Sequence, residues 1–405
     1  MKTILILSAG NEAIFGIKRA KDLGYKVVGL DGNPAAPGFA FVDEKIIAST
    51  YDIEDIIEKV RDFNKKNHID GVLSIAADVP KSVAAVAEEL GLLSITKLTA
   101  KICSEKFLMK ETFCAAGIKV PDFKKVSSLK DLKEFIKNDY LSYVLKPVDS
   151  RGARGVFKIS SKSNLLELFN KSLSYSKVKR LILEEYLDGP QISTESIIIN
   201  QKVHNIAYSD RNYEFLNKYA PNIIENGGDM PSNISKQIKS NISDLIKKIV
   251  NVLGIKNGTL KGDIVIHKDI PYVIEVAPRL SGGFFCTHQI PLHTGIDFLG
   301  AAIKQSMNDL EISDYDNFIP KSQRPVCSRF WFPKEGIVNS IGDFEKFRKY
   351  KNVEYIDIFV KVGDKIGPVN SHPSRAGVVI TSGDTKKESI ELAEKIIREV
   401  EIKIY

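Results

Sequence analysis

The sequence predicts a multidomain protein of mixed α/β and α+β class. Its 405 residues are enough for two or three domains. Residues 1–95 alternate between short β-rich runs and helical patterns, which is typical of a parallel sheet covered by helices. The run Thr259–Ala277 instead reads as two β-rich segments joined by a polar turn, which is typical of an antiparallel hairpin. Parallel and antiparallel pairing are therefore expected in different parts of the chain.

The glycines of the first 95 residues match the pattern of a dinucleotide-binding sheet only in part. Gly10 and Gly16 follow the first strand, but their spacing is not GxGxxG, so structural glycines are the alternative to cofactor binding. Any ligand is expected at the carboxyl ends of the strands, near Gly10–Glu12, Asp31–Asn33 and Ala77–Asp78. The expected elements are the strands Thr3–Leu7, Lys26–Leu30 and Gly71–Ile75 and the helices Glu12–Leu23, Ile53–Asn67 and Val79–Leu90.

The composition indicates a cytoplasmic protein that acts on small molecules. The net charge of +7 comes from 58 basic and 51 acidic residues, and much of the excess is lysine spread over predicted helices. No arginine-rich arm is present, so we expect no nucleic acid partner, and an anionic small substrate accounts for the charge as well as a polymer would. No apolar run is long enough to cross a membrane, and the N-terminus reads as a strand because its apolar core is only Ile4–Leu7. Four cysteines without CxxC spacing predict no disulfide framework.

Two lysines between residues 96 and 190 are placed to hold an anion. Ser104 is the expected N-cap of a helix Glu105–Ala116, which puts Lys106 in the first turn, where a cation is unfavourable unless it extends to an anion. An ordinary surface position is the alternative for this lysine. Lys146 closes the buried strand Tyr143–Leu145.

A loop rich in glycine and arginine follows Lys146. Gly152 and Gly155 allow the backbone to approach a phosphate closely, and consecutive N–H groups can hold its oxygen atoms. A plain β-hairpin loop is the alternative. The candidate phosphate-binding residues are Ser150, Arg151, Gly152, Ala153, Arg154 and Gly155.

The rest of the chain is predicted to hold further strands and helices around one long irregular stretch. Residues 210–231 are rich in loop-forming residues, and such a stretch inside a compact domain is more often functional than accidental. A final α+β piece begins near residue 320. The expected strands are Leu181–Leu187, Gln191–Ile199 and Ile402–Tyr405, and the expected helices are Ser235–Leu253, Ile296–Met307 and Lys386–Val400.

The hairpin Thr259–Ala277 places two carboxylates directly opposite each other. With the turn centred between the two runs, Asp263 pairs with Glu275 and Val265 pairs with Val273. The apolar face then consists of Ile264, Ile266, Tyr272, Ile274 and Val276. The polar face carries Lys261, Asp263, Glu275 and, just beyond the strand, Arg279.

The opposed carboxylates of this hairpin repel each other and weaken the sheet unless a cation lies between them. Mg²⁺ (or Mn²⁺) binds few carboxylates, keeps some water and shares its other positions with phosphate oxygens. Arg279, two pleats beyond Glu275, is placed to hold anionic oxygen atoms. The hairpin therefore predicts a metal site at Asp263 and Glu275, and an amphipathic hairpin that faces water is the alternative.

The order of these features along nearly the whole chain resembles the ATP-grasp superfamily. Similar proteins include phosphoribosylglycinamide synthetase, biotin carboxylase, the carbamoyl-phosphate synthetase subunits and amino-acid ligases. The resemblance implies a Rossmann-like pre-ATP-grasp domain, an ATP-grasp fold of two subdomains and a small C-terminal α+β domain. The implied boundaries are 1–95 for the N-terminal domain, 96–187 for the small or lid subdomain, 188–318 for the large subdomain and 319–405 for the C-terminal domain.

The resemblance also implies roles for the residues that would bind ATP and metal. Lys106 and Lys146 match the lysines that hold the α- and β-phosphates, and the glycine loop matches the flexible lid over the β- and γ-phosphates. Asp263 and Glu275 match the magnesium ligands, and Arg279 matches the arginine on the transferred phosphoryl group. The adenine and ribose side is assigned to Glu184, Glu185, Leu187 and Gln191, and the catalytic residues are Arg279 and Lys146.

The chain differs from similar proteins at two of the implied site residues. Gln191 stands where relatives often have a ribose-binding acid, and Ala277 stands where many have an asparagine metal ligand. The number of bound metal ions therefore stays open. The tentative substrate residues are Asp78, Ser281, Gly282, Gly283 and His288.

The function implied by the resemblance is an ATP- and Mg²⁺-dependent carboxylate–amine ligase that forms an acyl phosphate and then an amide bond. One candidate is a phosphoribosylglycinamide synthetase-like enzyme of purine biosynthesis, although the acidic continuation of that enzyme is replaced here by Leu280–Gly283. An amino-acid or dipeptide ligase and a biotin carboxylase-like enzyme are alternatives, and a non-catalytic nucleotide-binding regulator is the alternative of another class. No catalytic base is evident, and a homodimer is expected because dimers are common among similar proteins.

We predict that Glu275→Ala or Arg279→Ala abolishes turnover and leaves the fold intact. The reason is that each change removes one charged group from the predicted metal and phosphate site without touching the core. ADP release, measured beside circular dichroism of each variant, checks this expectation. Wild-type activity in either variant would remove the proposed site.

Overall fold

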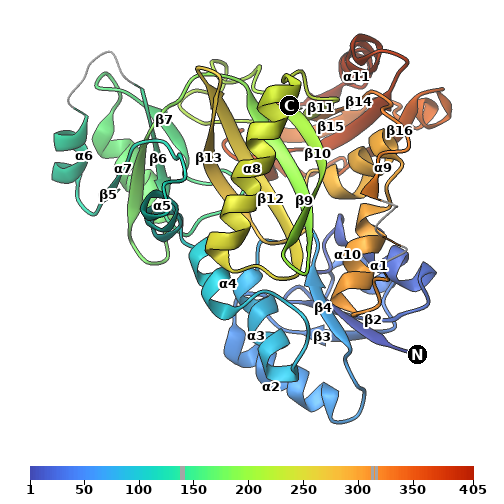
Figure 1. Ribbon diagram of the computed structural model, residues 1–405. Coiled ribbons are helices and arrows are strands. Elements are labelled where there is room, and N and C mark those ends of the chain that lie inside the picture. Colours follow the sequence, from blue (N-terminus) through green and yellow to red (C-terminus); the bar gives the residue numbers. More distant parts are fainter. Residues whose placement is uncertain (137–141, 312–313, 315–317) are drawn as a thin grey trace.

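The computed structural model describes residues 1–136, 142–311, 314 and 318–405, in which the strands form four sheets. Figure 1 shows the N-terminal sheet and its helices in blue at the bottom and a small green sheet at the left. A long sheet runs through the centre from the yellow hairpin to the red C-terminal segment. This arrangement confirms the predicted mixed class of parallel and antiparallel sheets.

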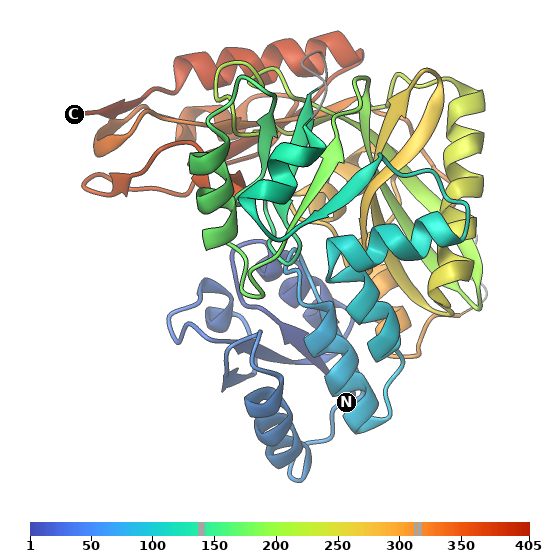
Figure 2. The same cartoon turned by 90° about the vertical axis from the view of Figure 1, so that its left-hand side faces the viewer.

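The N-terminal sheet is parallel, with strand order β3-β2-β1-β4. Its inner strands are buried on both faces, as expected when helices cover a parallel sheet. Figure 2 shows this domain below the rest of the molecule. The elements are β1 (Thr3–Leu7), α1 (Ala13–Asp22), β2 (Lys26–Asp31), β3 (Glu44–Ile47), α2 (Ile53–Asn64), β4 (Gly71–Ser74) and α3 (Pro80–Leu90).

A four-stranded antiparallel sheet of order β5-β8-β6-β7 forms the small subdomain. It packs against two helices through a separate apolar core that includes Leu145, Phe157 and Leu183. The elements are α4 (Lys97–Cys103), α5 (Lys106–Ala115), β5 (Phe123–Val126), α6 (Leu129–Phe135), β6 (Tyr143–Pro147), β7 (Phe157–Ile159), α7 (Leu165–Ser174) and β8 (Leu181–Glu185).

The central sheet has eight strands in the order β13-β12-β9-β10-β11-β14-β18-β16. Helix α8 covers one face through a core that contains Ile242, Ile246 and Ile249, while α9 and α10 pack on the other face. The sheet is continuous across the predicted boundary at 318/319, because β11 pairs with β14. The elements are β9 (Gln191–Ile199), β10 (Lys202–Arg211), β11 (Gly228–Met230), α8 (Lys236–Leu253), β12 (Gly258–His267), β13 (Ile270–Ala277), α9 (Ile290–Thr294), α10 (Phe298–Ser306), β14 (Val326–Trp331), β16 (Val353–Ile358) and β18 (Gly377–Ser382).

The C-terminal segment adds a helix and a small sheet to these strands. Helix α11 (Lys386–Glu399) packs on β14 and β18, and its N-cap Thr385 forms a capping box with Glu388. The small sheet joins β17 (Lys365–Ile366), β15 (Gly336–Ile341) and β19 (Ile402–Ile404). None of the helices in the described part of the chain is long and apolar enough to cross a membrane.

The hairpin confirms the predicted opposition of Asp263 and Glu275 but corrects the register beyond it. The turn is the pair Lys268–Asp269, whose φ angles of 51° and 61° suit a tight two-residue hairpin turn. A bulge next to Asp263 pairs Ile264 with Val273, so the predicted pairing of Val265 with Val273 is wrong and Val265 lies opposite Tyr272.

This bulge also changes the apolar face of the hairpin. Ile274 is the extra residue of β13 and lines a cleft, whereas Val273 joins Ile264, Ile266 and Val276 in the core. The predicted membership of Ile274 and Tyr272 in the apolar face is therefore wrong. A bulge inserts one residue, which moves the following side chains to the opposite face.

The predicted N-cap of helix α5 is wrong by one residue. Glu105, not Ser104, caps this helix, and its carboxylate accepts hydrogen bonds from the N–H groups of Phe107 (3.1 Å) and Leu108 (2.9 Å). Ser104 instead ends helix α4, where its hydroxyl donates to the carbonyl of Ala100. A carboxylate at this position also matches the positive end of the helix dipole.

We predict that Gly227→Ala destabilises the protein more than Gly254→Ala does. Both glycines have positive φ (79° and 63°), which costs a residue with a Cβ about 1–2 kcal/mol. At Gly227 the new Cβ would also lie 2.2 Å from the Ser328 carbonyl oxygen, whereas nothing lies within 4 Å at Gly254. Overpacking of this kind adds about 1–3 kcal/mol. Thermal unfolding midpoints measure the difference, and equal shifts would contradict the described packing of β11 on β14.

Candidate active site

A cleft of about 750 Å³ lies where the N-terminal domain, the small subdomain and the central sheet meet. The carboxyl ends of β1 and β4, the glycine loop and the polar face of the hairpin all contribute to its walls. The predicted residues that line it are Asp78, Lys106, Lys146, Ser150, Arg151, Gly152, Ala153, Arg154, Glu184, Glu185, Leu187, Gln191, Asp263, Glu275, Arg279, Gly282 and Gly283.

The opposed carboxylates of the hairpin are surrounded by cations. Asp263 Oδ1 lies 2.6 Å from Lys261 Nζ and 2.9 Å from Arg211 Nη1, and the residue is buried. Glu275 Oε2 lies 3.4 Å from Lys106 Nζ. The Lys106 ammonium holds the pKa of Glu275 well below its usual range. Glu275 is therefore ionised at any physiological pH.

This pair suits a hard cation that takes part of its coordination from a ligand. Within the described residues no group of three or more His, Cys, Asp or Glu side chains is placed to hold a metal ion. Asp263 and Glu275 supply two carboxylates from adjacent strands, which leaves the other positions to water and phosphate oxygens. That division is the one Mg²⁺ prefers.

Lys106 extends from the first turn of α5 into the cleft. Its side-chain ammonium donates to the carbonyl of Ser150 at 2.8 Å, and its backbone N–H donates to Val148 O at 2.9 Å. The lysine therefore bridges the glycine loop and the carboxylate of Glu275. A cation in this position is tolerated because it is directed at an anionic group rather than along the helix axis.

Lys146 is buried and paired with Glu184. Its ammonium lies 2.8 Å from Glu184 Oε2, and Lys110 approaches the same oxygen at 3.4 Å. Burial alone would raise the pKa of Glu184, but the two ammonium groups outweigh it and lower that pKa. Both lysines approach Oε2, while Oε1 has no hydrogen-bond partner among the described residues, and Glu184 lines the cleft. Glu185, which follows it on β8, is only partly buried and also lines the cleft.

Lys110 is a residue that the sequence reasoning missed. It is buried beneath the cleft, and burial lowers its pKa to about 8. Its ammonium also donates to the carbonyl of Val273 on β13 at 2.9 Å. The signal was available, because Lys106 and Lys110 are four residues apart on one helix and therefore share a face.

The glycine loop lies between the N-terminal domain and the C-terminal segment. Gly152 O accepts a hydrogen bond from His372 N at 3.0 Å, and a Cβ on Gly152 would lie 3.7 Å from Pro373. Gly155 does not line the cleft, because it packs against Pro147 and Tyr175. The other residues of the loop, 150–154, line the cleft.

Asp78 joins the glycine loop to the arginine of the predicted metal site. Its Oδ2 lies 3.1 Å from Arg151 Nε, and its Oδ1 lies 3.6 Å from Arg279 Nε. The Arg151 guanidinium also lies over the ring of Tyr51, 5.0 Å from its centre. One carboxylate of the N-terminal domain is therefore shared between two cleft arginines.

Ser281 and His288 are not brought to the cleft. Ser281 is buried, and its N–H donates to Glu195. The ring of His288 packs against Phe15 and Tyr355 at centroid distances of 4.4 and 4.7 Å. Burial lowers the pKa of His288 to about 4, so the imidazole is neutral at physiological pH. The tentative assignment of His288 to substrate contact has no support from its position.

A second charged group at the cleft was also missed. Glu225 lies between Arg211 (Nε, 3.1 Å) and Arg375 (Nη2, 3.2 Å), and the Arg375 guanidinium lies 3.8 Å from the centre of the Phe330 ring. Glu225 belongs to the irregular stretch 210–231, whose composition already indicated function. Its pairing with Arg375, 150 residues away, is not readable from sequence spacing.

Three family models match successive parts of the chain. The PylC-like N-terminal domain matches residues 4–96, the ATP-grasp domain matches residues 103–283, and the L-amino acid ligase C-terminal domain 2 matches residues 329–405. A formate-dependent phosphoribosylglycinamide formyltransferase of Prochlorococcus marinus is 22% identical over 420 aligned positions, covering 99% of this chain and 97% of that protein.

Solved structures share the whole fold. An L-amino acid ligase from Bacillus licheniformis has a TM-score of 0.84 at 24% identity and covers 100% of this chain and 99% of that one. A phosphoribosylglycinamide synthetase from Anaerococcus prevotii has a TM-score of 0.78 at 19% identity and covers 100% of both chains. At these identities the likeness establishes the fold.

We predict that Arg151→Ala and Asp78→Asn act on nucleotide binding as a coupled pair. A partly exposed ion pair is worth about 0.2–1 kcal/mol, so each change should raise the KM for ATP by up to about fivefold. The double variant should raise KM by less than the product of the two single effects, because the Arg151–Asp78 contact is lost in both single variants. Steady-state kinetics of the wild type, the two single variants and the double variant measure this double-mutant cycle. The matched control is Lys97→Ala, which removes a surface ion pair with Glu88 outside the cleft. Fully additive effects would show that the pair does not hold the loop.

Proposed function

We infer that this chain, a member of the ATP-grasp superfamily, is an ATP- and Mg²⁺-dependent carboxylate–amine ligase. In the first step a substrate carboxylate oxygen attacks the γ-phosphorus of ATP, the bond to the ADP oxygen breaks, and an acyl phosphate forms. In the second step an amine attacks the acyl carbon, the bond to the phosphate oxygen breaks, and the amine proton leaves with phosphate or solvent. The products are an amide, ADP and phosphate.

The observation that supports this reaction is that the opposed carboxylates, Arg279 and the glycine loop line one cleft. Phosphoryl transfer depends mainly on positioning and charge neutralisation. Lys106 and Lys146 would hold the phosphates, Arg279 would bind the oxygens of the transferred group, and Asp263 and Glu275 would hold Mg²⁺. When bound, the metal neutralises charge on the terminal phosphates.

The amine step needs no dedicated base in this proposal. An acyl phosphate is already activated, and several carboxylates of the cleft are held in ion pairs, such as Glu225 with Arg211 and Arg375. The contribution of the protein would be to orient the amine and to stabilise the developing oxyanion. Arg279 is the cation in the right part of the cleft for that second role.

For the substrates we propose two amino acids, so that the product is a dipeptide or a related amide. The match of residues 329–405 to an L-amino acid ligase domain and the whole-chain likeness to such a ligase support this choice. The far side of the cleft offers both signs of charge, with Arg375 beside Glu225 and aromatic walls at Phe330 and Phe359. Such a surface suits a zwitterion with an apolar side chain.

A phosphoribosylglycinamide synthetase-like reaction is the second candidate. The solved synthetase that shares the fold favours it. The turn after Arg279 weighs against it, because Leu280–Gly283 carries no acidic residue. Glycine is the carboxylate in that reaction, so the two candidates differ chiefly in the amine.

We also propose the working parts of the enzyme along the chain. They are a substrate-side N-terminal domain (1–95), a nucleotide lid (96–187), a metal-binding part (188–318) and a substrate-side C-terminal part (319–405). The ranges of the three family models support this division. We propose a cytoplasmic homodimer, and light scattering of the purified protein tests its size.

We predict that phosphate is released from ATP only when an amino acid and Mg²⁺ are both present. A panel of the common L-amino acids, tested singly and in pairs with a phosphate-release assay, measures this. Chelation with EDTA should abolish release, and Mg²⁺ or Mn²⁺ should restore it, because the carboxylate pair needs a divalent partner to bind the phosphates.

The panel includes glycine with phosphoribosylamine as a separate arm. Release only in that arm would favour the second candidate and overturn the dipeptide proposal. ADP formation that no amine or carboxylate stimulates would contradict a ligase altogether and indicate a nucleotide-binding regulator.

A further inference from the structure

The turn Ser281–Phe284, which follows Arg279, is held by two carboxylates from different domains. Glu195 on β9 accepts a hydrogen bond from Ser281 N at 3.3 Å. Glu12, at the start of α1, accepts from Gly283 N at 3.1 Å and from Phe284 N at 2.8 Å. We call Glu12 and Glu195 the carboxylate clamp.

Glu195 is buried, and among the described residues no cation lies within ion-pair distance of it, although Arg279 and Lys261 act on it from further away. Its exposed fraction is 0%, it lies in the middle of the central sheet opposite Lys261 and Ala207, and none of the described cations forms an ion pair with it. Its Oε2 has no hydrogen-bond partner among the described residues. Burial raises the pKa of Glu195 to about 7. A buried, incompletely satisfied carboxylate costs folding free energy, so its presence calls for a use other than stability.

Glu12 holds a strained piece of backbone. Gly283 and Phe284 both have positive φ (67° and 59°), and for Phe284 this conformation is unfavourable. Consecutive residues of this kind direct neighbouring N–H groups at one anion. The two oxygens of Glu12 each take one of these N–H groups, so the carboxylate and the strained turn fix each other.

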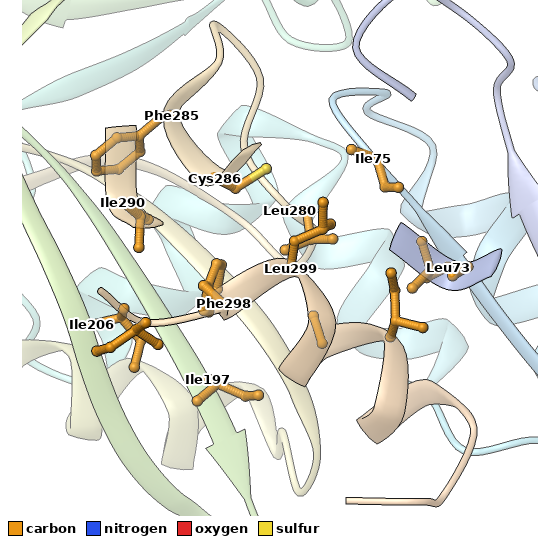
Figure 3. Packing of buried hydrophobic residues seen from close by; sticks show 14 of the residues in the cluster. Leu73, Ile75, Ile197, Ile206, Leu280, Phe285, Cys286, Ile290, Phe298 and Leu299 are labelled. Atoms are coloured by element: carbon orange, nitrogen blue, oxygen red, sulfur yellow. The ribbon is translucent and has the colours of Figure 1, made fainter. Parts of the chain in front are cut away.

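The apolar side of the same turn is anchored in the core. Figure 3 shows Leu280, Phe285 and Cys286 among the packed residues of the cluster, with Ile75 of the N-terminal domain nearby. Leu280 forms a β-bridge with Ile75. The turn is therefore fixed by apolar contacts below and by carboxylates at its N–H groups.

The position of Arg279 depends on this turn. Its N–H donates to Ala277 O at 2.9 Å, and its Nη1 donates to Leu280 O at 3.2 Å. Its ion pair within 4 Å is the 3.6 Å approach to Asp78, and Glu195 and Glu275 stabilise its charge from further away. The short hydrogen bonds of Arg279 are thus made to the backbone on either side of it, and its charge is balanced by nearby carboxylates.

We propose that Glu12 and Glu195 are positioning residues that hold Arg279 in place during phosphoryl transfer. The proposal rests on the proposed function for its kinetic consequences. A developing negative charge in the cleft pulls on the guanidinium, and the clamp prevents the turn from following it. Neither carboxylate needs to touch the reacting atoms. Both hold the N–H groups of residues 281–284, and Glu195 also stabilises the charge of Arg279 directly.

The kinetic test uses Glu195→Gln and Glu12→Gln, which keep an oxygen acceptor but remove the charge. We expect kcat to fall at least tenfold, while the KM for ATP and the affinity for MgADP stay within twofold. The thermal midpoint should stay the same or rise for Glu195→Gln, because a buried unpaired charge is removed. Asp43→Asn is the matched control, since Asp43 also accepts from a backbone N–H (Val27, 2.8 Å) but lies outside the cleft.

A second measurement tests the clamp without any turnover. Phenylglyoxal labelling followed by mass spectrometry should modify Arg279 at least threefold faster in Glu195→Gln than in the wild type, while labelling of Arg375 stays unchanged. A wild-type chain that shows no substrate-dependent turnover would refute the proposed function, whereas the labelling still reports on the clamp. Unchanged labelling of Arg279 overturns the clamp. The clamp is also overturned if the variant that loses kcat has a lower thermal midpoint than the wild type, or if its affinity for MgADP falls by the same factor as kcat.

Discussion

The cleft depends on the compensation of two opposed carboxylates in the middle of a sheet. Side chains directly opposite in an antiparallel pair lie about 5 Å apart. At an effective dielectric of about 20, two like charges at that distance repel by ~3 kcal/mol. Asp263 and Glu275 are stable there because Lys261, Arg211 and Lys106 surround them. The same cations come from three separate parts of the chain, so this one charge balance ties the small subdomain to the central sheet.

This balance explains why a polyanion with a divalent metal fits the cleft. A metal held by Asp263 and Glu275 would take over the role of the cations, and Lys106 and Lys261 would then become available to phosphate oxygens. The site would therefore exchange one charge-compensated arrangement for another, without a large net desolvation of charge. Lys146 differs from Lys106 in this respect, because its pairing with Glu184 is deeply buried and shared with Lys110.

The sequence predicted what local periodicity determines and missed what distant contacts determine. Alternation gave the parallel sheet and the opposition of Asp263 and Glu275, but nothing local indicated the bulge that places Ile274 in the cleft. Motif order identified the cleft-lining residues, while the partners of Glu184 and Glu225 come from other elements. The sequence did not single out Glu195, because a glutamate inside a predicted strand is ordinarily exposed to solvent. Its burial follows from the elements that pack around the strand.

Glu12 and Asp78 indicate a role for the N-terminal domain in the cleft. Its incomplete glycine pattern alone did not indicate such a role. In a sheet of order β3-β2-β1-β4 the connections reverse direction between β1 and β4, and ligands of such sheets bind at that point beyond the carboxyl ends of the strands. Glu12 follows β1 and Asp78 follows β4, and both are directed at the segment 279–284 of the central part of the chain. The crevice that would receive a dinucleotide in other sheets of this kind is therefore occupied by the protein's own turn. If the clamp acts as proposed, this domain contributes to catalysis by fixing an arginine rather than by binding a cofactor.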